Sequence, residues 1–363
     1  MPVLQEPDEA EGRNDPRGIE PARSALDAAR ERPTLKIDIH NHSYPERYWK
    51  TLVKLSERVS FPVNVRRILS YYPQKGILVA PGDTIAPAEK AGIGTQVLSL
   101  SSPNVYMPDA AMSLDLAQMA NDAYVDIQRK HPGKFYTLAS VPLNFPELAV
   151  RELDRAVKLG MNGIVLGSNI AGKPLSSPEF FPFYERVNEL GLPIFIHPMS
   201  PPHLDAEDEF FLAPLILYPT ETTLAATKMI FAGVFERFPN VVLILPHLGG
   251  TLPYLKGRID SGYRNHAACR KNISRRPSEY FGNFYFDTIS LNVPALRCAL
   301  EIAGPDHLVF GSDYPFWPLD NVAVIDGNLD DLELSPEDRH AIERGNLLRI
   351  LSNVPGIPAG QKQ

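Results

Sequence analysis

Eight short apolar runs recur along the chain, and longer stretches with helical spacing separate most of them. The runs are nearly continuous in Val, Ile, Leu and Phe and do not alternate with polar residues, which is typical of strands buried on both faces of a parallel sheet. We predict one sheet of eight such strands, at 34–40, 95–103, 135–143, 163–168, 193–198, 241–247, 284–289 and 307–313.

The stretches between these strands carry helix start and stop signals. Prolines open two of them and glycines close the same two, as expected for first helical turns and for the residue after the last turn. Ser113 is predicted to open a third helix, and Ser335, in the sequence SPED, is predicted to cap the last. The predicted helices are 113–131, 146–160, 178–191, 220–237 and 335–351.

Alternating strands and helices predict an α/β fold. Eight units over about 280 residues match the (β/α)8 barrel, or TIM barrel, which usually has ~250 residues plus insertions. A doubly wound open sheet is the structural alternative, but no GxGxxG follows the first strand. Two longer segments, 43–93 and 199–219, follow strands one and five at the C-terminal face, so we expect insertions there that form pocket walls.

The region 34–352 contains no internal repeat or linker, and we predict that it forms a single domain. Residues 1–33 are polar and contain acids and prolines where a targeting signal needs a basic end and an apolar run, so we expect a poorly ordered arm. The tail, 353–363, is expected to be loose.

Composition excludes several classes of protein. Of the 363 residues, 44% are hydrophobic and 22% charged, which is ordinary for a soluble globular protein. The net charge of −7 and the lack of a Lys/Arg-rich run argue against a nucleic-acid or membrane partner and favour a small molecule. No apolar stretch approaches 18 residues. Two cysteines, Cys269 and Cys298, suit neither a disulfide framework nor a Cys-type zinc site, so we expect a reduced, cytoplasmic protein.

Histidine or aspartate stands at the same end of five predicted strands. The residues are His40, His42, His197, His247, Asp287 and Asp313. Positions i and i+2 of a strand face the same side, so His40 and His42 can bind one ion together. Imidazoles with a carboxylate and one open position form a catalytic site for zinc or a similar divalent ion. Each histidine alone is more often structural, and it is their coincidence at one rim that predicts a metal site.

The other histidines divide into two groups. His203 lies in the second insertion and is a candidate for the pocket lining. The remaining four lie in predicted helices or loops, where solvated or capping roles are expected: His131, His266, His307 and His340. For Asp287, a direct site role and a capping or orienting role both stay open.

Several segments resemble the decarboxylases of the amidohydrolase superfamily. They are IDIHNHSYP, PIFIHP, YPTETTLAATKMIFAGVFERFPNVVLILPHLGG, RRPSEYFGNFYFDT and LVFGSDYPF. That group includes aminocarboxymuconate-semialdehyde decarboxylase and the resorcylate, 6-methylsalicylate and carboxyvanillate decarboxylases. The resemblance covers roughly 35–352, and the GSDYPF and HLGG segments are typical of this branch. It implies cleavage of a C–C bond with release of CO2 from a carboxylate on a phenolic or unsaturated skeleton.

The resemblance also implies roles for individual residues. A divalent metal is expected on the matching His40, His42, His197 and Asp313, with Zn²⁺ as the expected ion, Mn²⁺ as the alternative and no organic cofactor. The residue matching His247 is expected near metal-bound water or substrate. Either Asp313 or His247 would handle the proton, and both assignments stay open.

The substrate expected from the resemblance is a monocarboxylate. The semialdehyde enzyme carries an arginine for a second carboxylate, and here the matching neighbourhood, PGDTIAPAEK, has none. Arg258 and Arg264 persist in LKGRIDSGYRNH and are candidates for substrate binding, together with Asp287 and His203. Because such relatives are commonly dimers or tetramers, Arg258 or Arg264 could serve a neighbouring subunit. We therefore expect an aromatic hydroxy acid and a homodimer or homotetramer.

Two alternatives stay open at this point. A metal-dependent hydrolase of the same superfamily, a lactonase or amidase, could use the same ligands to activate water. Two-metal hydrolases usually carry a bridging lysine at the end of strand four, and the sequence GIVLGSNIAGK has no Lys there, so one metal per chain is expected. A non-catalytic barrel with a structural metal is disfavoured, because structural sites close all four positions, commonly with cysteine.

Overall fold

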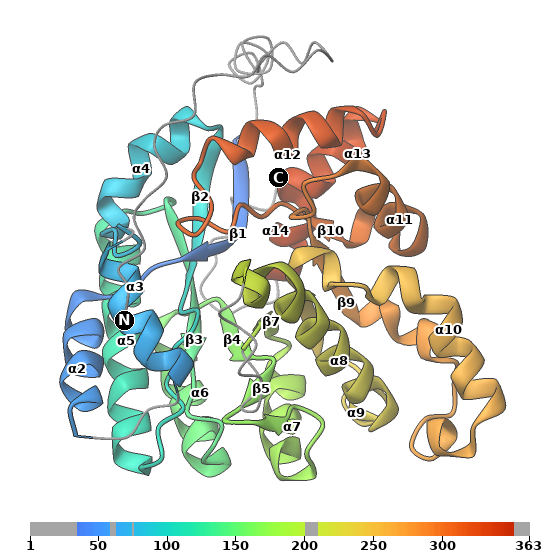
Figure 1. The fold of residues 1–363 in the computed structure, drawn as a ribbon, viewed down its shortest axis with the longest axis horizontal. Helices are drawn as coiled ribbons and strands as arrows, with labels where there is room; N and C mark the ends of the chain where they lie inside the picture. The colour runs from blue at the N-terminus through green and yellow to red at the C-terminus, as the bar shows by residue number, and fades with distance from the viewer. Residues whose placement is uncertain (1–34, 59–62, 75, 200–209, 352–363) are drawn as a thin grey trace.

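The computed structural model describes residues 35–58, 63–74, 76–199 and 210–351. Eight parallel strands form one sheet in the order β1-β2-β3-β4-β7-β8-β9-β10, with helices around it (Figure 1). All eight predicted strands are confirmed, with ends that differ by a few residues. The strands are β1 (Lys36–His42), β2 (Ile93–Ser99), β3 (Phe135–Ser140), β4 (Gly163–Gly167), β7 (Pro193–His197), β8 (Val242–Leu245), β9 (Phe284–Asp287) and β10 (Leu308–Val309).

Hydrogen bonds between the first and last strands close the sheet on itself. The Ile39 amide donates to the Phe310 carbonyl at 3.0 Å, and the Asp313 amide donates to the His40 carbonyl at 2.8 Å. The sheet is therefore a (β/α)8 barrel, as predicted. Closure also brings the residues after β10 beside the end of β1, so that Asp313 meets the two histidines of β1.

Helices cover the outside of the barrel, with α2 and α5 on one side of the strands in Figure 1 and α10 and α11 on the other. The helices after the strands are α5 (Ala110–Lys130), α6 (Pro146–Leu159), α7 (Phe181–Leu190), α8 (Tyr218–Phe231), α9 (Val234–Arg237), α10 (Leu252–Asn265), α11 (Val293–Ala303), α12 (Asn321–Asp330), α13 (Pro336–His340) and α14 (Asn346–Leu351). A small antiparallel pair, β5 (Asn169–Ile170) and β6 (Lys173–Pro174), follows β4.

Three helix predictions are corrected in detail. Helix α5 begins earlier than predicted, because the Asp109 side chain, and not Ser113, caps it by accepting from the Met112 amide. The predicted helix 220–237 is divided at Gly233, whose left-handed φ of 77° interrupts the helical turn. The last predicted helix starts at its Ser335 cap as expected but contains a π turn between α13 and α14.

The first predicted insertion, 43–93, folds into α2 (Glu46–Ser56), α3 (Val63–Gln74) and α4 (Pro81–Lys90). Its aromatic side chains pack together: the rings of Tyr44 and Tyr72 are 5.3 Å apart, and those of Trp49 and Tyr72 are 5.8 Å apart. The Tyr72 ring also lies 5.2 Å from Phe316, which follows β10. The insertion is therefore packed against the C-terminal rim of the barrel, where it was expected to form a wall.

A buried ion pair stabilises the opposite end of β1. The Lys36 ammonium is 3.0 Å from the Asp326 carboxylate of α12, and both side chains are almost fully buried. Arg339 also contacts Asp326, at 3.1 Å. Lys36 starts the strand that His42 ends, so this pair serves the structure of the barrel and lies away from the rim.

Parts of the sequence analysis fall outside the described residues. These are the predicted arm 1–33, the predicted tail 353–363, and the part of the second insertion at 200–209, which includes His203. None of the helices in the described ranges has the combination of length and apolar character that a membrane crossing needs.

Candidate metal centre

Three histidines meet at the C-terminal rim of the barrel. His40 and His42 come from the end of β1 and His197 ends β7, and all three are buried. One ring nitrogen from each lies within 4.8 Å of the corresponding nitrogens of the other two. The structure therefore brings together three of the four predicted metal ligands from strands one and five of the barrel.

Hydrogen bonds at Nδ1 determine which ring nitrogen of each β1 histidine is free to bind a cation. The Nδ1 atom of His40 lies 2.7 Å from the Asp287 carboxylate, and Nδ1 of His42 lies 3.1 Å from the Ser99 hydroxyl. An imidazole that donates from Nδ1 to such a partner keeps the lone pair of Nε2 free for a cation. Both Nε2 atoms are buried and have no hydrogen-bond partner in the described structure.

In His197, too, Nδ1 is the donor nitrogen and Nε2 is the free one. Its Nδ1 donates to the Pro198 carbonyl at 2.9 Å, which leaves Nε2 as the acceptor nitrogen. The hydroxyl of Ser101, which follows β2, lies 3.0 Å from that Nε2. The sequence analysis did not single out Ser101, because a serine after a buried strand carries no metal or catalytic signal of its own.

Asp313 completes the group from the other side of the closed sheet. One of its carboxylate oxygens is 3.2 Å from Nε2 of His40 and 3.4 Å from Nε2 of His42. Its backbone is in the left-handed region, with φ of 60°, a conformation that non-glycine residues adopt mainly where the surroundings hold them there. The turn after β10 thus aims the carboxylate at the two histidines.

The electrostatics of the group fit a site for one cation. Burial alone would lower the pKa of His40, but the charge of Asp313 and the hydrogen bond to Asp287 raise it to about 10. Burial lowers the pKa of His42 to about 4. Burial alone would raise the pKa of Asp313, but the charge of His40 holds it well below its usual range. One positive charge is therefore stabilised beside Asp313, and a bound cation would replace that proton.

The donor set fits a divalent transition metal. It consists of three buried imidazoles and one carboxylate, and Nε2 of His40 and of His42 has no hydrogen-bond partner in the described structure. Imidazole with carboxylate is a combination that Zn²⁺ and Mn²⁺ both accept. The ligands come from three separate strand ends, so that they do not close into the tight cluster typical of a structural zinc site.

His247 stands after β8, at the more open side of the cluster. Its Nε2 is 3.5 Å from the second carboxylate oxygen of Asp313, and its side chain is 16% exposed, whereas the side chains of His40 and His42 are fully buried. With His40 and Asp313 it forms a second group of potential ligand atoms within 4.8 Å of one another. His247 is therefore close to Asp313 and more exposed than His40 and His42.

Asp287 lies behind His40, and its side chain is fully buried. One oxygen accepts from His40 Nδ1, and the other accepts from the backbone amides of Leu248 and Ile289, each at 3.1 Å. These contacts orient His40 and also hold the turn that carries His247. Of the two roles left open for Asp287, the geometry favours the orienting one.

A second buried carboxylate, Asp38, holds Asp313 in place. One oxygen of Asp38 accepts from the Ser312 amide at 2.9 Å and the other from the Ser312 hydroxyl at 2.6 Å. The His40 amide donates to Asp38 as well, at 3.2 Å. Burial raises the pKa of Asp38 to about 6, although the Ser312 hydrogen bonds act in the opposite direction. Asp38 therefore joins β1 to the turn that carries Asp313.

We expect Asp38→Asn to weaken metal binding by about 10- to 100-fold, the range seen when groups that orient metal ligands are changed. In the wild type both Asp38 oxygens accept hydrogen bonds from Ser312. The asparagine side chain has an NH2 group in place of one oxygen and would face one of these donors with another donor, so the turn before Asp313 would shift. Titration of metal-free protein with Mn²⁺ against a chelator measures this affinity. Asp83→Asn, on the exterior helix α4, is the control, and equal affinity for the Asp38 variant and the wild type would show that Asp38 does not position the site.

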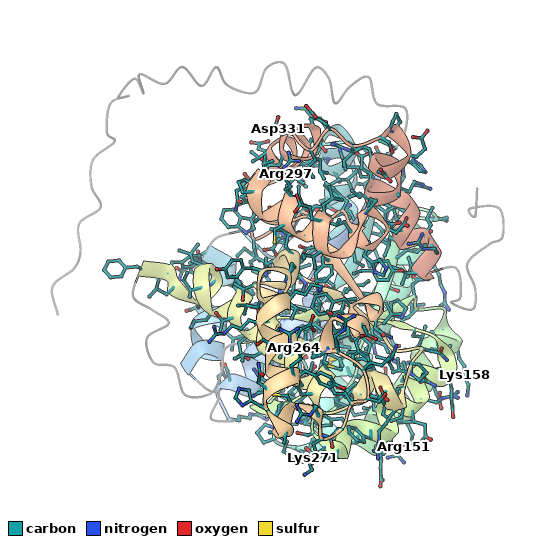
Figure 2. All side chains as sticks on the ribbon, turned by 90° about the vertical axis from the view of Figure 1, so that its right-hand side faces the viewer. Arg151, Lys158, Arg264, Lys271, Arg297 and Asp331 are labelled. Atoms are coloured by element: carbon teal, nitrogen blue, oxygen red, sulfur yellow. The ribbon has the colours of Figure 1, made fainter. Side chains whose placement is uncertain are left out.

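The predicted substrate-binding arginines lie on α10. Arg258 and Arg264 are both exposed, and neither has a contact with the histidine cluster within the described residues. Figure 2 shows Arg264 on the outer side of the barrel, on the face turned toward the viewer. Their predicted role in substrate binding stays a prediction.

The histidines that were expected to be structural lie apart from the cluster. His131 and His266 flank the ends of α5 and α10, and His340 is exposed at the end of α13. Nδ1 of His307 donates to the Phe284 carbonyl at 2.7 Å. These placements agree with solvated or capping roles.

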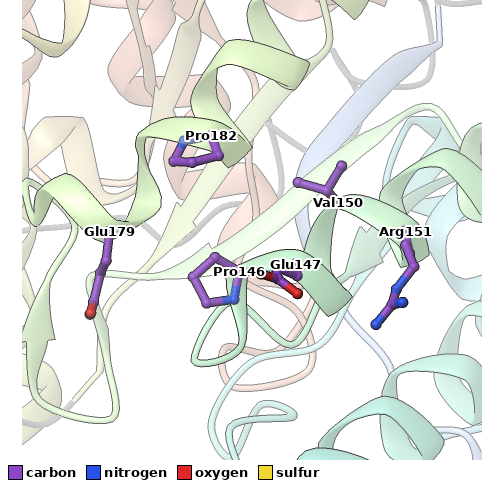
Figure 3. A pocket seen from close by; sticks show the side chains of 6 residues that line it. All are labelled: Pro146, Glu147, Val150, Arg151, Glu179 and Pro182. Atoms are coloured by element: carbon purple, nitrogen blue, oxygen red, sulfur yellow. The ribbon is translucent and has the colours of Figure 1, made fainter.

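A separate surface pocket lies on the outside of the barrel (Figure 3). It is lined by Pro146, Glu147, Val150 and Arg151 of α6, by Glu179 of the 3-10 turn Pro178–Phe180, and by Pro182 of α7. Acidic and basic side chains face it together, and no member of the histidine cluster borders it. We assign it no part in the chemistry.

The fold and the cluster together define a class of protein: a (β/α)8 barrel with a buried His and Asp metal centre at the C-terminal ends of its strands. Sequence comparison identifies the family within that class. The family model for Amidohydrolase matches residues 88–352, and this protein belongs to that family.

Individual relatives are decarboxylases. A 2-amino-3-carboxymuconate-6-semialdehyde decarboxylase from Dictyostelium discoideum is 32% identical over 89% of this chain and 93% of its own length. A gamma-resorcylate decarboxylase from Polaromonas sp. (strain JS666) is 32% identical over 71% of this chain and 83% of its own length. A dihydroxybenzoic acid decarboxylase structure from Polaromonas sp. JS666, with bound manganese and the inhibitor 2-nitroresorcinol, has a TM-score of 0.73 and 27% identity, covering 88% of this chain and 97% of that one.

Proposed function

We propose that this protein is a metal-dependent, non-oxidative decarboxylase that releases CO2 from an aromatic hydroxy acid. The observation that carries the proposal is the convergence of the Nε2 atoms of His40 and His42 with the Asp313 carboxylate at the rim of the barrel. Relatives that align over most of this chain act as decarboxylases. The enzyme class that this supports is a carboxy-lyase of the amidohydrolase family.

The proposed ligands of one divalent cation are His40, His42, His197 and Asp313. The sequence favoured Zn²⁺, whereas the manganese in the Polaromonas structure supports Mn²⁺, so Mn²⁺ is the first ion to test and Zn²⁺ the second. When bound, the ion supplies Lewis acidity and a template that holds a carboxylate and a neighbouring phenolic oxygen. Asp287 and Asp38 keep the protein ligands in the orientation that this requires.

The chemical step replaces a carbon–carboxylate bond by a carbon–hydrogen bond. A proton is added to the ring carbon that bears the carboxylate, the bond to the carboxylate breaks, its electron pair returns to the ring, and CO2 leaves. The chain therefore has to provide a proton donor that faces that carbon. His247 and Asp313 lie 3.5 Å apart, so a proton can pass between them and reach the ring from either group.

The wall around the cluster suits a flat ring. The Phe316 ring lies 5.3 Å from the His42 ring and 5.2 Å from the Tyr72 ring. Aromatic side chains at these separations bind planar rings through offset or edge contacts and exclude water from the carboxylate. This lining supports an aromatic substrate over an aliphatic one.

We propose further that the protein is a cytoplasmic homodimer or homotetramer. Four large apolar side chains at 210–216 are exposed in the described chain, namely Phe210, Phe211, Leu215 and Ile216. Apolar groups gathered in this way support an interface between subunits. Light scattering during size-exclusion chromatography measures the assembly, and a mass of 40.3 kDa in solution would contradict it.

The proposed function is tested by product analysis. Purified protein loaded with Mn²⁺ or Zn²⁺ is incubated with a panel of mono- and dihydroxybenzoic acids, and CO2 and the decarboxylated phenol are measured together. We expect equal amounts of both products from at least one acid. Aryl lactones and amides in the same assay test the hydrolase alternative, and their hydrolysis without CO2 from any acid would overturn the decarboxylase assignment.

A further inference from the structure

Ser101 occupies a special place beside the metal centre. It follows β2, it is only 2% exposed, and its hydroxyl lies 3.0 Å from Nε2 of His197. Because Nδ1 of His197 donates to the Pro198 carbonyl, Nε2 is the acceptor and the Ser101 hydroxyl is the donor in this contact. The same Nε2 is the proposed ligand atom for the cation.

Two buried tyrosines lie near Ser101 on the side of the first insertion. The rings of Tyr44 and Tyr72 are 5.3 Å apart, and Ser101 acts to lower the pKa of both phenols. The Tyr44 hydroxyl also donates to the Ser102 carbonyl at 3.1 Å. Burial raises the pKa of both tyrosines well above its usual value, so these hydroxyls stay protonated. We call Tyr44, Tyr72 and Ser101 the hydroxyl cluster.

The hydrogen-bond inventory changes when a cation takes the lone pair of His197 Nε2. Ser101 then loses its acceptor, and a buried hydroxyl without a partner is unfavourable. Tyr44 already places its proton on the Ser102 carbonyl. The Ser101 proton is then available for a new acceptor, and the position of Ser101, 3.0 Å from the ligand nitrogen, favours an acceptor beside the cation.

The charge around the hydroxyl cluster indicates which acceptor fits. Among the side chains that the structure describes, Lys36 is the only buried Lys or Arg, and it pairs with Asp326 at the other end of β1. The donors that the described structure places in the hydroxyl cluster are therefore neutral hydroxyls, and its one buried Lys lies at the opposite end of β1. One carboxylate bound to the metal, with an oxygen facing Ser101, would accept a hydrogen bond from the Ser101 hydroxyl.

We propose that Ser101 is a substrate-binding residue whose hydroxyl, now 3.0 Å from His197 Nε2, donates to a carboxylate oxygen of the metal-bound aromatic acid. This inference rests on the proposed function and adds a residue that recognises the reacting group. A hydrogen bond from a hydroxyl to a charged oxygen is stronger than one between neutral groups. Ser101 would therefore contribute directly to the affinity for the anion.

The test compares Ser101→Ala with Ser102→Ala, using 2-nitroresorcinol as a probe on Mn²⁺-saturated protein. The neighbouring Ser102 hydroxyl contacts the Met199 sulfur at 3.0 Å and makes a matched control. Absorbance titration follows both the Kd of the probe and the visible band of its bound anion. We expect Ser101→Ala to raise Kd about tenfold and to shift the band, because one charge-assisted hydrogen bond is lost. Ser102→Ala is expected to match the wild type.

A second measurement separates substrate binding from a structural role. If Ser101 only oriented His197, the alanine variant would bind Mn²⁺ more weakly, whereas the proposal predicts Mn²⁺ affinity equal to or above that of the wild type. Ser101→Cys, which keeps the size and leaves a weak donor, provides the same comparison if the alanine variant does not fold. Unchanged probe Kd and spectrum in the Ser101 variants would overturn the role of Ser101 alone. A wild type that neither binds the probe nor releases CO2 would count against the proposed function itself.

Discussion

Asp313→Asn is expected to lower kcat for CO2 release by about 10³-fold or more, since this one residue is both a proposed metal ligand and a proposed proton carrier. An asparagine keeps the shape of the side chain but has no charge to attract the cation and no proton to exchange with His247. The oxygen that lies 3.2 Å from His40 and 3.4 Å from His42 would lose its negative charge. Metal affinity should fall together with kcat.

The matched control is Asp320→Asn, the same chemical change seven residues later. Asp320 is exposed and precedes α12 without forming a side-chain cap. Both variants should have wild-type circular dichroism, and only the Asp313 variant should lose turnover when assayed at saturating Mn²⁺. Wild-type turnover by Asp313→Asn would remove this residue from the chemistry.

His247→Gln is expected to lower kcat by about 10²- to 10⁴-fold, the range typical of general acid–base groups. In contrast to the Asp313 variant, it should keep its metal, because the other proposed ligands, His40, His42 and His197, remain. The residue stands at the open side of the cluster, 3.5 Å from Asp313, and glutamine can hydrogen-bond there but cannot transfer a proton. The measurement is kcat together with metal content for each variant.

His266→Gln provides the control for that change, because His266 is exposed at the end of α10. It should leave both kcat and metal content unchanged. Loss of metal together with activity in the His247 variant would show that His247 acts mainly as a metal ligand. A normal kcat would exclude it as the proton donor.

The fold could be predicted because its signal lies in the strands themselves. Runs such as VVLILPH, which ends in His247, are apolar at consecutive positions and so on both faces of the strand. A barrel buries both faces, because helices cover its outside and the strands enclose its interior. The rim residues could be predicted for the same reason: parallel strands that close into a barrel bring all their C-terminal ends together, so His40, His197 and Asp313 become neighbours although they are far apart in sequence.

The residues that orient the site could not be predicted in this way. Asp38 precedes His40 by two positions, but its partner, Ser312, is 274 positions away, and only closure of the sheet makes the contact. Ser101 carries no signal in sequence, because its importance depends on which nitrogen of His197 is free. The start of α5 was misplaced because Ser113 and Asp109 are both acceptable caps and only the backbone decides between them.

The most direct test of the account is a metal titration of activity. Protein is freed of metal with a chelator, the chelator is removed, and CO2 release is followed from an acid that the panel identifies while Mn²⁺ or Zn²⁺ is added in small steps. The account predicts no turnover without metal and a linear rise that ends at one ion per chain. Full turnover by the metal-free protein, or a rise that ends at two ions per chain, would contradict the centre built on His40, His42, His197 and Asp313.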